Sequence, residues 1–361
     1  MKQVLAIMRM LVLTPLSYIY GAVTFVRNKL FDARILKSHK FDVPVISIGN
    51  LAVGGTGKTP HTEYIVERLF RMYNVGVISR GYKRKTKGFV LANVKSTPYD
   101  IGDEPYQIYQ KYGERINVAV CEKRAKGIAE LLKINPEINL IILDDAFQHR
   151  YVKPSLSILL TEYGHPLFED RLLPLGRLRE SIQAVNRAEI VVVTKCPEDI
   201  KPVNFRLFKK NLNLFPYQKL FFSRFKYDSL VPVFPAESTY VPLLELLTAK
   251  DTILTITGIA NPKPLVRYLK QYNAKAKVMH FSDHHNFTRD DICDIENAYD
   301  NLKGRYKIIL TTEKDAVRLA NNPYFPHRLK QHIFYQPIEV EFLNYEEDFD
   351  ETLIKLLTNI K

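Results

Sequence analysis

The segment VPVISIGNLAVGGTGKTP at residues 43–60 constrains the fold of this 361-residue chain more than any other. An apolar, β-branched run leads into glycines and then into Gly-Lys-Thr-Pro. A strand, a Gly-rich turn and a helix in this order form a phosphate-binding loop, whose backbone N–H groups and helix N-terminus hold phosphate oxygens. We therefore predict a buried strand over 43–48 and a helix that begins near Lys58. The alternative is a Gly-rich turn with a solvated lysine.

Six consecutive positions are expected to bind the nucleotide phosphates: Gly54, Gly55, Thr56, Gly57, Lys58 and Thr59. The lysine side chain would contact the β- and γ-phosphates, and the threonine hydroxyl would hold Mg²⁺. The general motif G-x-x-x-x-G-K-[ST] has glycine where this chain has Ala52, so Gly54 and Gly55 are expected to supply the backbone freedom. A guanine-reading motif, Thr-Lys-x-Asp, fails at 194–197 because Pro197 replaces the aspartate. ATP is therefore the expected nucleotide.

Two carboxylates follow the apolar run NLIIL at 139–143. Asp144 and Asp145 would lie at the carboxyl end of that strand, where an open α/β sheet binds its ligands. A Mg²⁺-organising acid belongs at this place, and a helix-capping role is the alternative. Gln148 and His149 come next, and they could contact metal-bound water or phosphate, or form a local turn network.

Apolar runs alternate with helical patterns beyond the loop. Strands are expected at 75–79, 117–121, 139–143, 156–160 and 189–193, and helices at 60–73, 103–112 and 123–134. Continuous apolar strands separated by helices predict an α/β fold of the P-loop NTPase type, with a mostly parallel sheet and helices on both faces. A second, smaller α/β domain is expected from strands near 252–257, 276–281 and 307–312.

The chain is therefore expected to have five parts. They are an apolar N-terminal helical segment (1–40), a P-loop core (41–215), an inter-domain linker region (216–249), a second α/β domain (250–340) and a C-terminal helix that could return to the core (341–361). Three widely spaced cysteines in no metal-like pairing indicate a reduced, cytosolic compartment.

Positive charge concentrates near the N-terminus. The net charge is +13, and the first 40 residues carry seven Lys or Arg against one Asp. Residues 10–26 have no charge, and small or polar residues recur there every three or four positions: Thr14, Ser17, Gly21, Thr24 and Asn28. This pattern, a narrow small-and-polar stripe on an otherwise apolar helix, favours a helix that lies in a membrane interface. A buried helix of the core is the alternative. A second basic cluster at 80–87 suits nucleic acid, anionic headgroups or a phosphorylated substrate, or else forms a solvated basic face.

The segment HFSDHHNF at 280–287 holds three histidines and Asp283. Zinc is one interpretation, but the spacing matches no tetrahedral site well. A histidine presented as part of an acid/base pair is the favoured interpretation.

Eight blocks in order resemble the tetraacyldisaccharide 4'-kinase (lipid A 4'-kinase) family of Gram-negative bacteria. They are GNLAVGGTGKTP (49–60), SRGY (79–82), GDEP (102–105), LDDAFQHR (143–150), LPLGRLRE (173–180), TGIANP (257–262), FSDHHNF (281–287) and TTEKDAVR (311–318). Two positions depart from the family pattern, because Ala146 and Lys83 stand where the family usually has glycine.

The resemblance implies transfer of the ATP γ-phosphoryl group to the 4'-hydroxyl of a tetraacylated, 1-phosphorylated glucosamine disaccharide. It implies that Asp103 is the general base and that His284 is its partner, although the two lie in different predicted domains. Arg179 and Glu180 would be charged groups at the transfer site, with Glu180 and Gln148 near Mg²⁺. Tyr82 and the neighbouring Arg80 would contact the lipid substrate.

The expected partners are the acylated disaccharide and the inner-membrane surface, with no nucleic acid and no obligate protein partner. The expected location is the cytoplasmic face of the bacterial inner membrane, as a peripheral or monotopic protein. A P-loop ligase or kinase acting on a soluble molecule is one alternative, and it would have no use for the apolar helix. A nucleotide switch or membrane-recruitment protein is another, and the failed guanine motif argues against it.

Overall fold

A computed structural model describes residues 2–259, 261–272, 274–343 and 346–359. The chain forms two compact units. The first unit combines residues 1–94, 108–225 and 340–361, and the second combines residues 95–107 and 226–339. The sequence places 95–107 in the P-loop core, whereas this segment belongs to the second unit.

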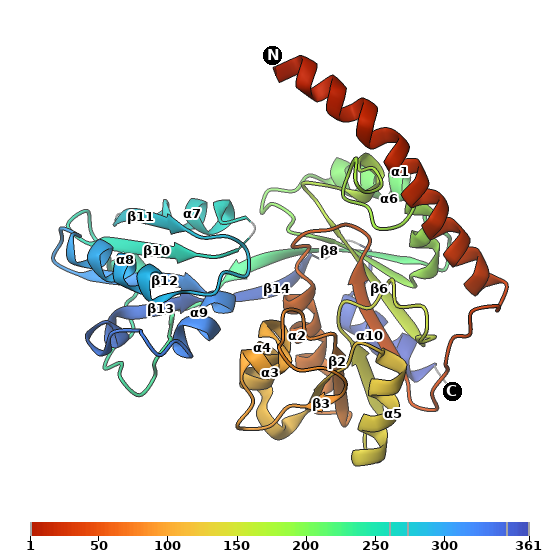
Figure 1. Cartoon of the computed structure of the whole chain (residues 1–361), viewed down its shortest axis with the longest axis horizontal. Helices are drawn as coiled ribbons and strands as arrows, with labels where there is room; N and C mark the ends of the chain where they lie inside the picture. Colours follow the sequence, from red (N-terminus) through yellow and green to blue (C-terminus); the bar gives the residue numbers. More distant parts are fainter. Residues whose placement is uncertain (1, 260, 273, 344–345, 360–361) are drawn as a thin grey trace. The chain divides into compact units, whose positions relative to one another are not determined.

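The first unit is built on a nine-stranded sheet in the order β14-β8-β7-β6-β1-β5-β2-β4-β3 (Figure 1). The strands are β1 (Val45–Asn50), β2 (Val75–Ser79), β3 (Val90–Leu91), β4 (Asn117–Val120), β5 (Leu140–Leu143), β6 (Leu156–Glu162), β7 (Ile190–Thr194), β8 (Lys219–Tyr227) and β14 (Ile338–Leu343). The strands from β8 to β4 pair in parallel, and β3 pairs antiparallel with β4. Every residue of β1 is buried, which explains its continuous apolar run.

Helices cover both faces of this sheet, so the predicted P-loop NTPase-type α/β fold is confirmed. The helices of this unit are α1 (Lys2–Asp32), α2 (Lys58–Leu69), α5 (Arg124–Ile134), α6 (Pro202–Leu212) and α10 (Phe349–Thr358). Ile46 of β1 packs in one cluster with Ile65 of α2, whereas the neighbouring Val45 packs in another with Ile128 of α5. Short 3₁₀ helices are η1 (Gly113–Arg115), η2 (Leu167–Glu169) and η3 (Ile182–Arg187).

The strand β8 lies within the region expected to be a linker. It pairs in parallel with β7, and Phe221 and Phe222 are buried in its centre. The sequence obscured this strand because its aromatic and basic residues do not form the continuous aliphatic run of the other strands.

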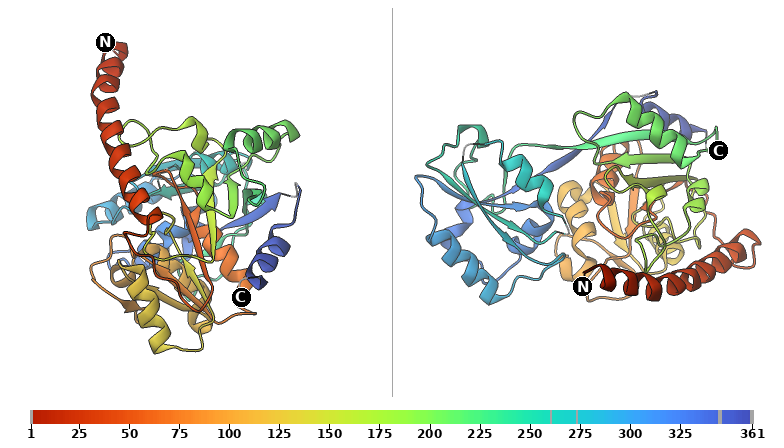
Figure 2. Two further views of the ribbon diagram at one scale, coloured as in Figure 1. Left: turned by 90° about the vertical axis from the view of Figure 1, so that its right-hand side faces the viewer. Right: turned by 90° about the horizontal axis from the view of Figure 1, so that it is seen from above.

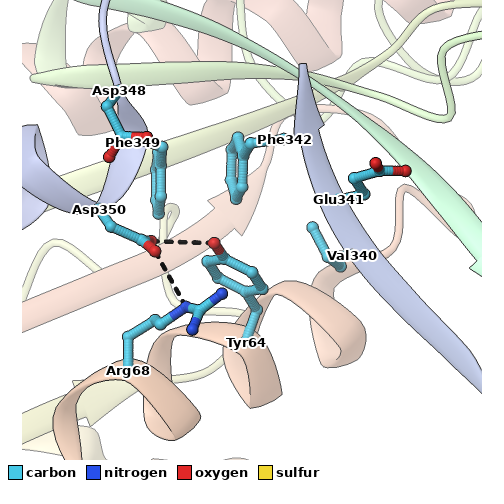
Figure 3. Close-up of a pocket in the computed structure, with 8 residues that line it drawn as sticks. All are labelled: Tyr64, Arg68, Val340, Glu341, Phe342, Asp348, Phe349 and Asp350. Atoms are coloured by element: carbon cyan, nitrogen blue, oxygen red, sulfur yellow. Dashed lines mark hydrogen bonds and ion pairs between the residues drawn. The ribbon is translucent and has the colours of Figure 1, made fainter. Parts of the chain in front are cut away.

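The C-terminal helix α10 packs on the first unit. Phe349, at its start, stacks on Phe342 of β14 with ring centroids 3.8 Å apart. Asp350 accepts a hydrogen bond from the Tyr64 hydroxyl (2.9 Å) and pairs with Arg68 (3.0 Å), both on α2 (Figure 3). These three polar residues line the pocket drawn in Figure 3, and their contacts tie α10 to α2.

The helix α1 packs on the rest of the first unit through its small-and-polar stripe. Ser17 is buried and donates to the Leu172 carbonyl (2.9 Å), and an added Cβ at Gly21 would lie 2.8 Å from a methyl of Leu172. The opposite faces stay exposed, with side chains of Leu11, Val12, Leu16, Tyr18, Ile19, Val23, Phe25 and Val26 in solvent. Figure 2 shows that the N-terminal part of α1 extends past the rest of this unit. By length and composition, Met10–Asp32 is able to cross a membrane, and 6% of its most apolar window is buried.

The second unit has a five-stranded sheet in the order β11-β10-β12-β13-β9. Its strands are β9 (Val231–Pro232), β10 (Thr252–Thr257), β11 (Lys275–His280), β12 (Lys307–Thr312) and β13 (Ile333–Gln336), and all pairs but β13–β9 are parallel. Its helical segments are α3 (Pro98–Ile101), the first half of α4 (Asp103–Tyr112), η4 (Leu244–Leu246), α7 (Lys263–Leu269), α8 (Arg289–Asp300), α9 (Glu313–Ala320) and η5 (His327–His332). Within the TGIANP block, Ala260 lies outside the described residues.

Candidate active site

The segment between β1 and α2 has the backbone of a phosphate-binding loop. Gly57 precedes α2 with φ 87°, and an added Cβ there would lie 2.6 Å from the Phe225 ring, so only glycine fits. Gly54 also has a positive φ of 126°. Apart from the adjoining residues, no atom of the described chain lies within 4 Å of an added Cβ at Gly54 or Gly55, so this side of the loop is open.

Ala52 does not need to be glycine because its neighbourhood is extended. It is buried and forms an antiparallel bridge with Leu178. The Val53 N–H donates to the Arg177 carbonyl (2.8 Å), and the Arg179 N–H donates to the Leu51 carbonyl (2.7 Å). The first half of the loop is thus paired with the LPLGRLRE segment, and this pairing brings Arg179 beside the loop.

A buried hydrogen-bond chain braces the second half of the loop. The Asn50 amide donates to the Thr56 hydroxyl (2.9 Å), and the Thr194 hydroxyl at the end of β7 donates to the Thr56 carbonyl (2.9 Å). All three residues are at most 4% exposed. Asn50 was not predicted as a site residue. The Thr-Lys segment at 194–195 was predicted only as a possible base-reading motif, whereas Thr194 supports the loop itself.

His61 is a second brace that the sequence did not reveal. Its Nδ1 donates to the Gly57 carbonyl (2.7 Å), and its Nε2 accepts from the Ser223 hydroxyl (2.8 Å). This assignment requires a neutral ring, and burial lowers the pKa of His61 to about 4. The only signal in the sequence for this contact was the position of His61, four residues and therefore about one helical turn after Gly57.

The two adjacent acids have different surroundings. Asp144 is 1% exposed and accepts from the Thr62 hydroxyl of α2 (2.9 Å). Asp145 has φ 46°, and its Oδ1 lies 3.7 Å from Lys58 Nζ and 3.7 Å from Arg179 Nη1. The left-handed turn falls on Asp145, which explains why alanine is accepted at position 146. Asp145 is therefore the acid that lies between the two predicted catalytic cations.

Gln148 and Glu180 lie beside this cluster. The Gln148 side-chain amide donates to the Asn50 carbonyl, and its oxygen accepts from Arg179 (3.5 Å). Glu180 is 1% exposed, and its Oε2 accepts from Asn28 of α1 (3.0 Å) and pairs with Arg187 (2.8 Å). The predicted membrane helix therefore contacts the site directly.

Several buried polar atoms around the loop have no hydrogen-bond partner within the described chain. They are Asn50 Oδ1, Asp145 Oδ1, Glu180 Oε1, His149 Nε2 and Arg124 Nε. Burial lowers the pKa of His149 to about 4, with help from Arg124, Arg27 and Arg80, so its ring is neutral. Unsatisfied buried polar atoms are costly. The free oxygens of Asn50 and Asp145, whose side chains contact Thr56 and lie near Lys58 in the open loop, fit a bound Mg²⁺ ion with water. Sequence reasoning missed Arg124, whose position at the start of α5 gave no signal.

The basic loop after β2 holds the two predicted substrate residues. Gly81 and Lys83 both adopt positive φ, 70° and 59°, so Lys83 has a left-handed conformation that glycine adopts more readily. Arg84 donates to the Gly88 carbonyl (2.6 Å) and to Glu122 (2.6 Å), which closes the loop. Arg80 and Tyr82 are exposed, Tyr82 by 55%.

Asp103 and His284 both belong to the second unit. The sequence had placed them in two different domains. His284 Nδ1 lies 3.1 Å from Asp103 Oδ2. Arg318 donates to both oxygens of Asp103, through Nε to Oδ1 (3.1 Å) and through Nη2 to Oδ2. Burial alone would raise the pKa of Asp103, but the hydrogen bonds from His284 and Arg318 outweigh it and hold the pKa below its usual value. Asp103 is therefore a carboxylate that accepts protons or hydrogen bonds.

The other histidines near His284 have separate partners. His285 Nε2 pairs with Asp291 (2.9 Å), which also completes the N-terminal capping box of α8. His280 Nδ1 lies 3.3 Å from the Thr257 hydroxyl. Within the described ranges, no group of three or more His, Cys, Asp or Glu could hold a metal ion. A Mg²⁺ ion bound mainly through phosphates needs only one or two protein ligands and is compatible with this finding.

Comparison with known proteins gives one consistent family. The model of the tetraacyldisaccharide-1-P 4'-kinase family matches residues 9–358. The tetraacyldisaccharide 4'-kinase of Bacteroides thetaiotaomicron is 53% identical over 350 residues, which are 95% of this chain and 92% of the relative. That of Flavobacterium johnsoniae is 42% identical over 346 residues, 96% of each chain.

A crystal structure of LpxK from Aquifex aeolicus in complex with ATP matches with a TM-score of 0.72 and 29% sequence identity. The match covers 96% of this chain and 97% of that one. Together with the phosphate-binding loop and the Asp103–His284 pair, these similarities establish that the chain belongs to the tetraacyldisaccharide-1-P 4'-kinase family.

Proposed function

We propose that this protein transfers the γ-phosphoryl group of ATP to the 4'-hydroxyl of a tetraacylated disaccharide 1-phosphate, a lipid A precursor. The observation that carries the proposal is the cluster at the phosphate-binding loop, where Asp145 Oδ1 lies 3.7 Å from both Lys58 Nζ and Arg179 Nη1. Two cations at an open loop suit the charge of a phosphoryl group in transfer, and the acid between them suits Mg²⁺.

On the donor side, the backbone of Gly54 to Gly57 would cradle the phosphates, and Lys58 would neutralise charge on the β- and γ-phosphates. Thr59 and Asp145 would hold Mg²⁺, with Asp144, Gln148 and Glu180 around it. The ion would offset the negative charge that develops on the phosphate oxygens during transfer. Arg179 would contact the transferring group as the second cation beside Asp145.

On the acceptor side, Asp103 would accept the proton of the sugar hydroxyl. Its Oδ1 receives one hydrogen bond from Arg318 and keeps a second acceptor position, since a carboxylate oxygen has two. A hydroxyl is a weak nucleophile, and a positioned base typically contributes ~10²- to 10⁴-fold to the rate. His284 would orient this carboxylate through Nδ1.

The exposed apolar faces of α1 would lie in the cytoplasmic leaflet of the inner membrane. Arg27 and Lys29 follow the apolar stretch, where cations suit anionic headgroups. Arg80 and Tyr82 would contact the lipid substrate. The stripe of α1 that binds the rest of the unit leaves this apolar surface free for acyl chains.

The test is to incubate the full-length protein with ATP, Mg²⁺ and a tetraacylated disaccharide 1-phosphate in mixed micelles, and to measure phosphate transfer to lipid by mass spectrometry. We expect a bisphosphorylated lipid and an equal amount of ADP. A parallel reaction uses the same disaccharide without acyl chains. Equal turnover of both substrates would favour a kinase for soluble molecules, and no transfer to either would refute the proposal.

A further inference from the structure

The helix α9 presents two cations to the Asp103–His284 pair. Lys314 and Arg318 are four residues apart and therefore lie on one face of the helix. The start of α9 is fixed by Thr312, whose hydroxyl donates to Asp315 (2.7 Å), and Asp315 also accepts from the Gly258 N–H (2.8 Å). The Gly258 carbonyl in turn accepts from the His284 N–H (3.1 Å). Gly258 therefore contacts both elements: its N–H binds Asp315 at the start of α9, and its carbonyl binds the backbone of His284.

Lys314 determines where His284 carries its proton. Lys314 Nζ lies 2.8 Å from His284 Nε2. An ammonium group donates hydrogen bonds and cannot accept them, so Nε2 must present its lone pair. The proton of the neutral ring is then on Nδ1, which faces Asp103 Oδ2 at 3.1 Å. The other tautomer would point an N–H at the ammonium and a lone pair at the carboxylate.

Arg318 competes with Asp103 for Nδ1 of the ring, because its Nη2, which can only donate, lies 3.2 Å from that atom. Asp103 Oδ2 is nearer, at 3.1 Å, and it also accepts from Arg318 Nη2, so the carboxylate is the closest partner of Nδ1. Asp283 and Glu104 lie 3.6 and 3.9 Å from Lys314 Nζ and form ion pairs with it. Asp283 also approaches Nε2, at 4.0 Å, but it is farther away than the lysine. His285, the next residue in the loop, pairs with Asp291.

The backbone conformation of His284 also indicates that the surrounding contacts determine the position of its ring. His284 has φ 57°, a left-handed conformation that is unfavourable for a residue with a Cβ. Such a conformation persists only where surrounding contacts determine it. The contacts here are the Gly258 carbonyl, Asp103 and Lys314.

We infer that Lys314 is a positioning residue that holds His284 as a neutral imidazole with its proton on Nδ1, so that Asp103 remains an acceptor for the substrate hydroxyl. The inference rests on the proposed function for its link to catalysis, but the state of the ring can be measured without substrate.

The first test is nuclear magnetic resonance of the full-length protein labelled with ¹⁵N in histidine. The His284 signals are assigned by their loss in His284→Gln. At neutral pH we expect a protonated Nδ1 and an unprotonated Nε2. In Lys314→Met, which keeps the length of the side chain and removes its charge, we expect the Nε2-protonated or doubly protonated form to appear. A wild-type ring protonated on Nε2, or an identical spectrum in Lys314→Met, would overturn the inference.

The second test is steady-state kinetics with ATP and the acylated disaccharide. We expect Lys314→Met to lower kcat by about 10- to 100-fold, the range seen when an orienting hydrogen-bond partner is removed, with little change in the KM for ATP. Lys314→Arg keeps a donor and should restore part of the loss. Lys270→Met, an exposed lysine at the end of α7, is the matched control and should behave as wild type.

The two tests separate this inference from the proposed function. A wild-type protein without any phosphate transfer, but with the expected ring state, would refute the function alone. Normal kcat in both His284→Gln and Lys314→Met would refute the catalytic role of the pair and with it the positioning role of Lys314. Circular dichroism and thermal melting of each variant establish that it is folded.

Discussion

The brace between β7 and the phosphate-binding loop gives a prediction with a matched control. Thr194 is fully buried and donates its hydroxyl to the Thr56 carbonyl at 2.9 Å. Valine has nearly the same shape but no hydroxyl. Thr194→Val therefore removes this hydrogen bond and opens no cavity.

The size of the effect follows from the carbonyl that loses its donor. A buried acceptor left without a partner costs about 1–3 kcal/mol. If the loop moves so that the Thr56 carbonyl finds another hydrogen-bond donor, the free-energy cost lowers the affinity for phosphate as well as the stability of the fold. Since 1.4 kcal/mol is a factor of ten, ATP affinity should fall by about 5- to 150-fold.

Thr311→Val is the control because Thr311 is equally buried and donates to the Ile256 carbonyl, also at 2.9 Å, but in the second unit. Both variants should lose a similar amount of unfolding free energy in urea titrations. Only Thr194→Val should bind ATP more weakly by calorimetry. Equal ATP affinity in the two variants would show that the bond stabilises the fold and has no role in shaping the loop.

Further predictions concern Lys58, the Asp103–His284 pair, the buried His61 and the helix α1. Lys58→Ala should abolish phosphate transfer while the protein stays folded, as checked by labelled ATP and circular dichroism. Asp103→Ala and His284→Ala should each lower kcat by ~10²- to 10⁴-fold, and the double variant should be little worse than the worse single one; multiplicative losses would contradict the pairing. Burial lowers the pKa of His61 to about 4 in the folded protein, whereas in the unfolded chain it is near 6.5. Between these pH values the unfolded chain binds a proton at His61 and the folded protein does not. Stability should therefore fall by roughly 1.4 kcal/mol per pH unit from 6.5 towards 4, and His61→Gln should lose this component in urea titrations; an unchanged pH dependence would refute it. Removal of residues 1–30 should lower activity even in detergent, because the contact of Asn28 with Glu180 is lost; full activity in micelles would contradict this.

The parallel core and the loop were predictable because their signals are local. Continuous aliphatic runs such as 140–143 and 190–194 form buried strands, and the Gly-Lys-Thr sequence marks the start of α2 at Lys58. The strand β8 was not predicted because its run mixes phenylalanine with lysine and arginine. Strand pairing with β7 overrides that weak local pattern.

The candidate site was predictable only for residue types with a known chemical role at a strand end or loop. Lys58, Asp145 and Arg179 meet because β1, β5 and the 173–180 segment are neighbours, and the motif blocks named all three. Thr194 and His61 act through single hydrogen bonds to backbone carbonyls, which leave no spacing pattern in the sequence. Sequence alone also gave no reason to group Asp103 with the second unit.

The most direct test of the central claim is the position of the new phosphate on the lipid product. After reaction of the full-length protein with ATP and a tetraacylated disaccharide 1-phosphate, ³¹P and ¹H nuclear magnetic resonance of the purified lipid locates each phosphate by its coupling to a ring proton. The proposed function predicts one new phosphomonoester coupled to the 4'-proton, absent from a parallel reaction with Lys58→Ala. A phosphate at another hydroxyl, a pyrophosphate at position 1, or an unchanged lipid would contradict it.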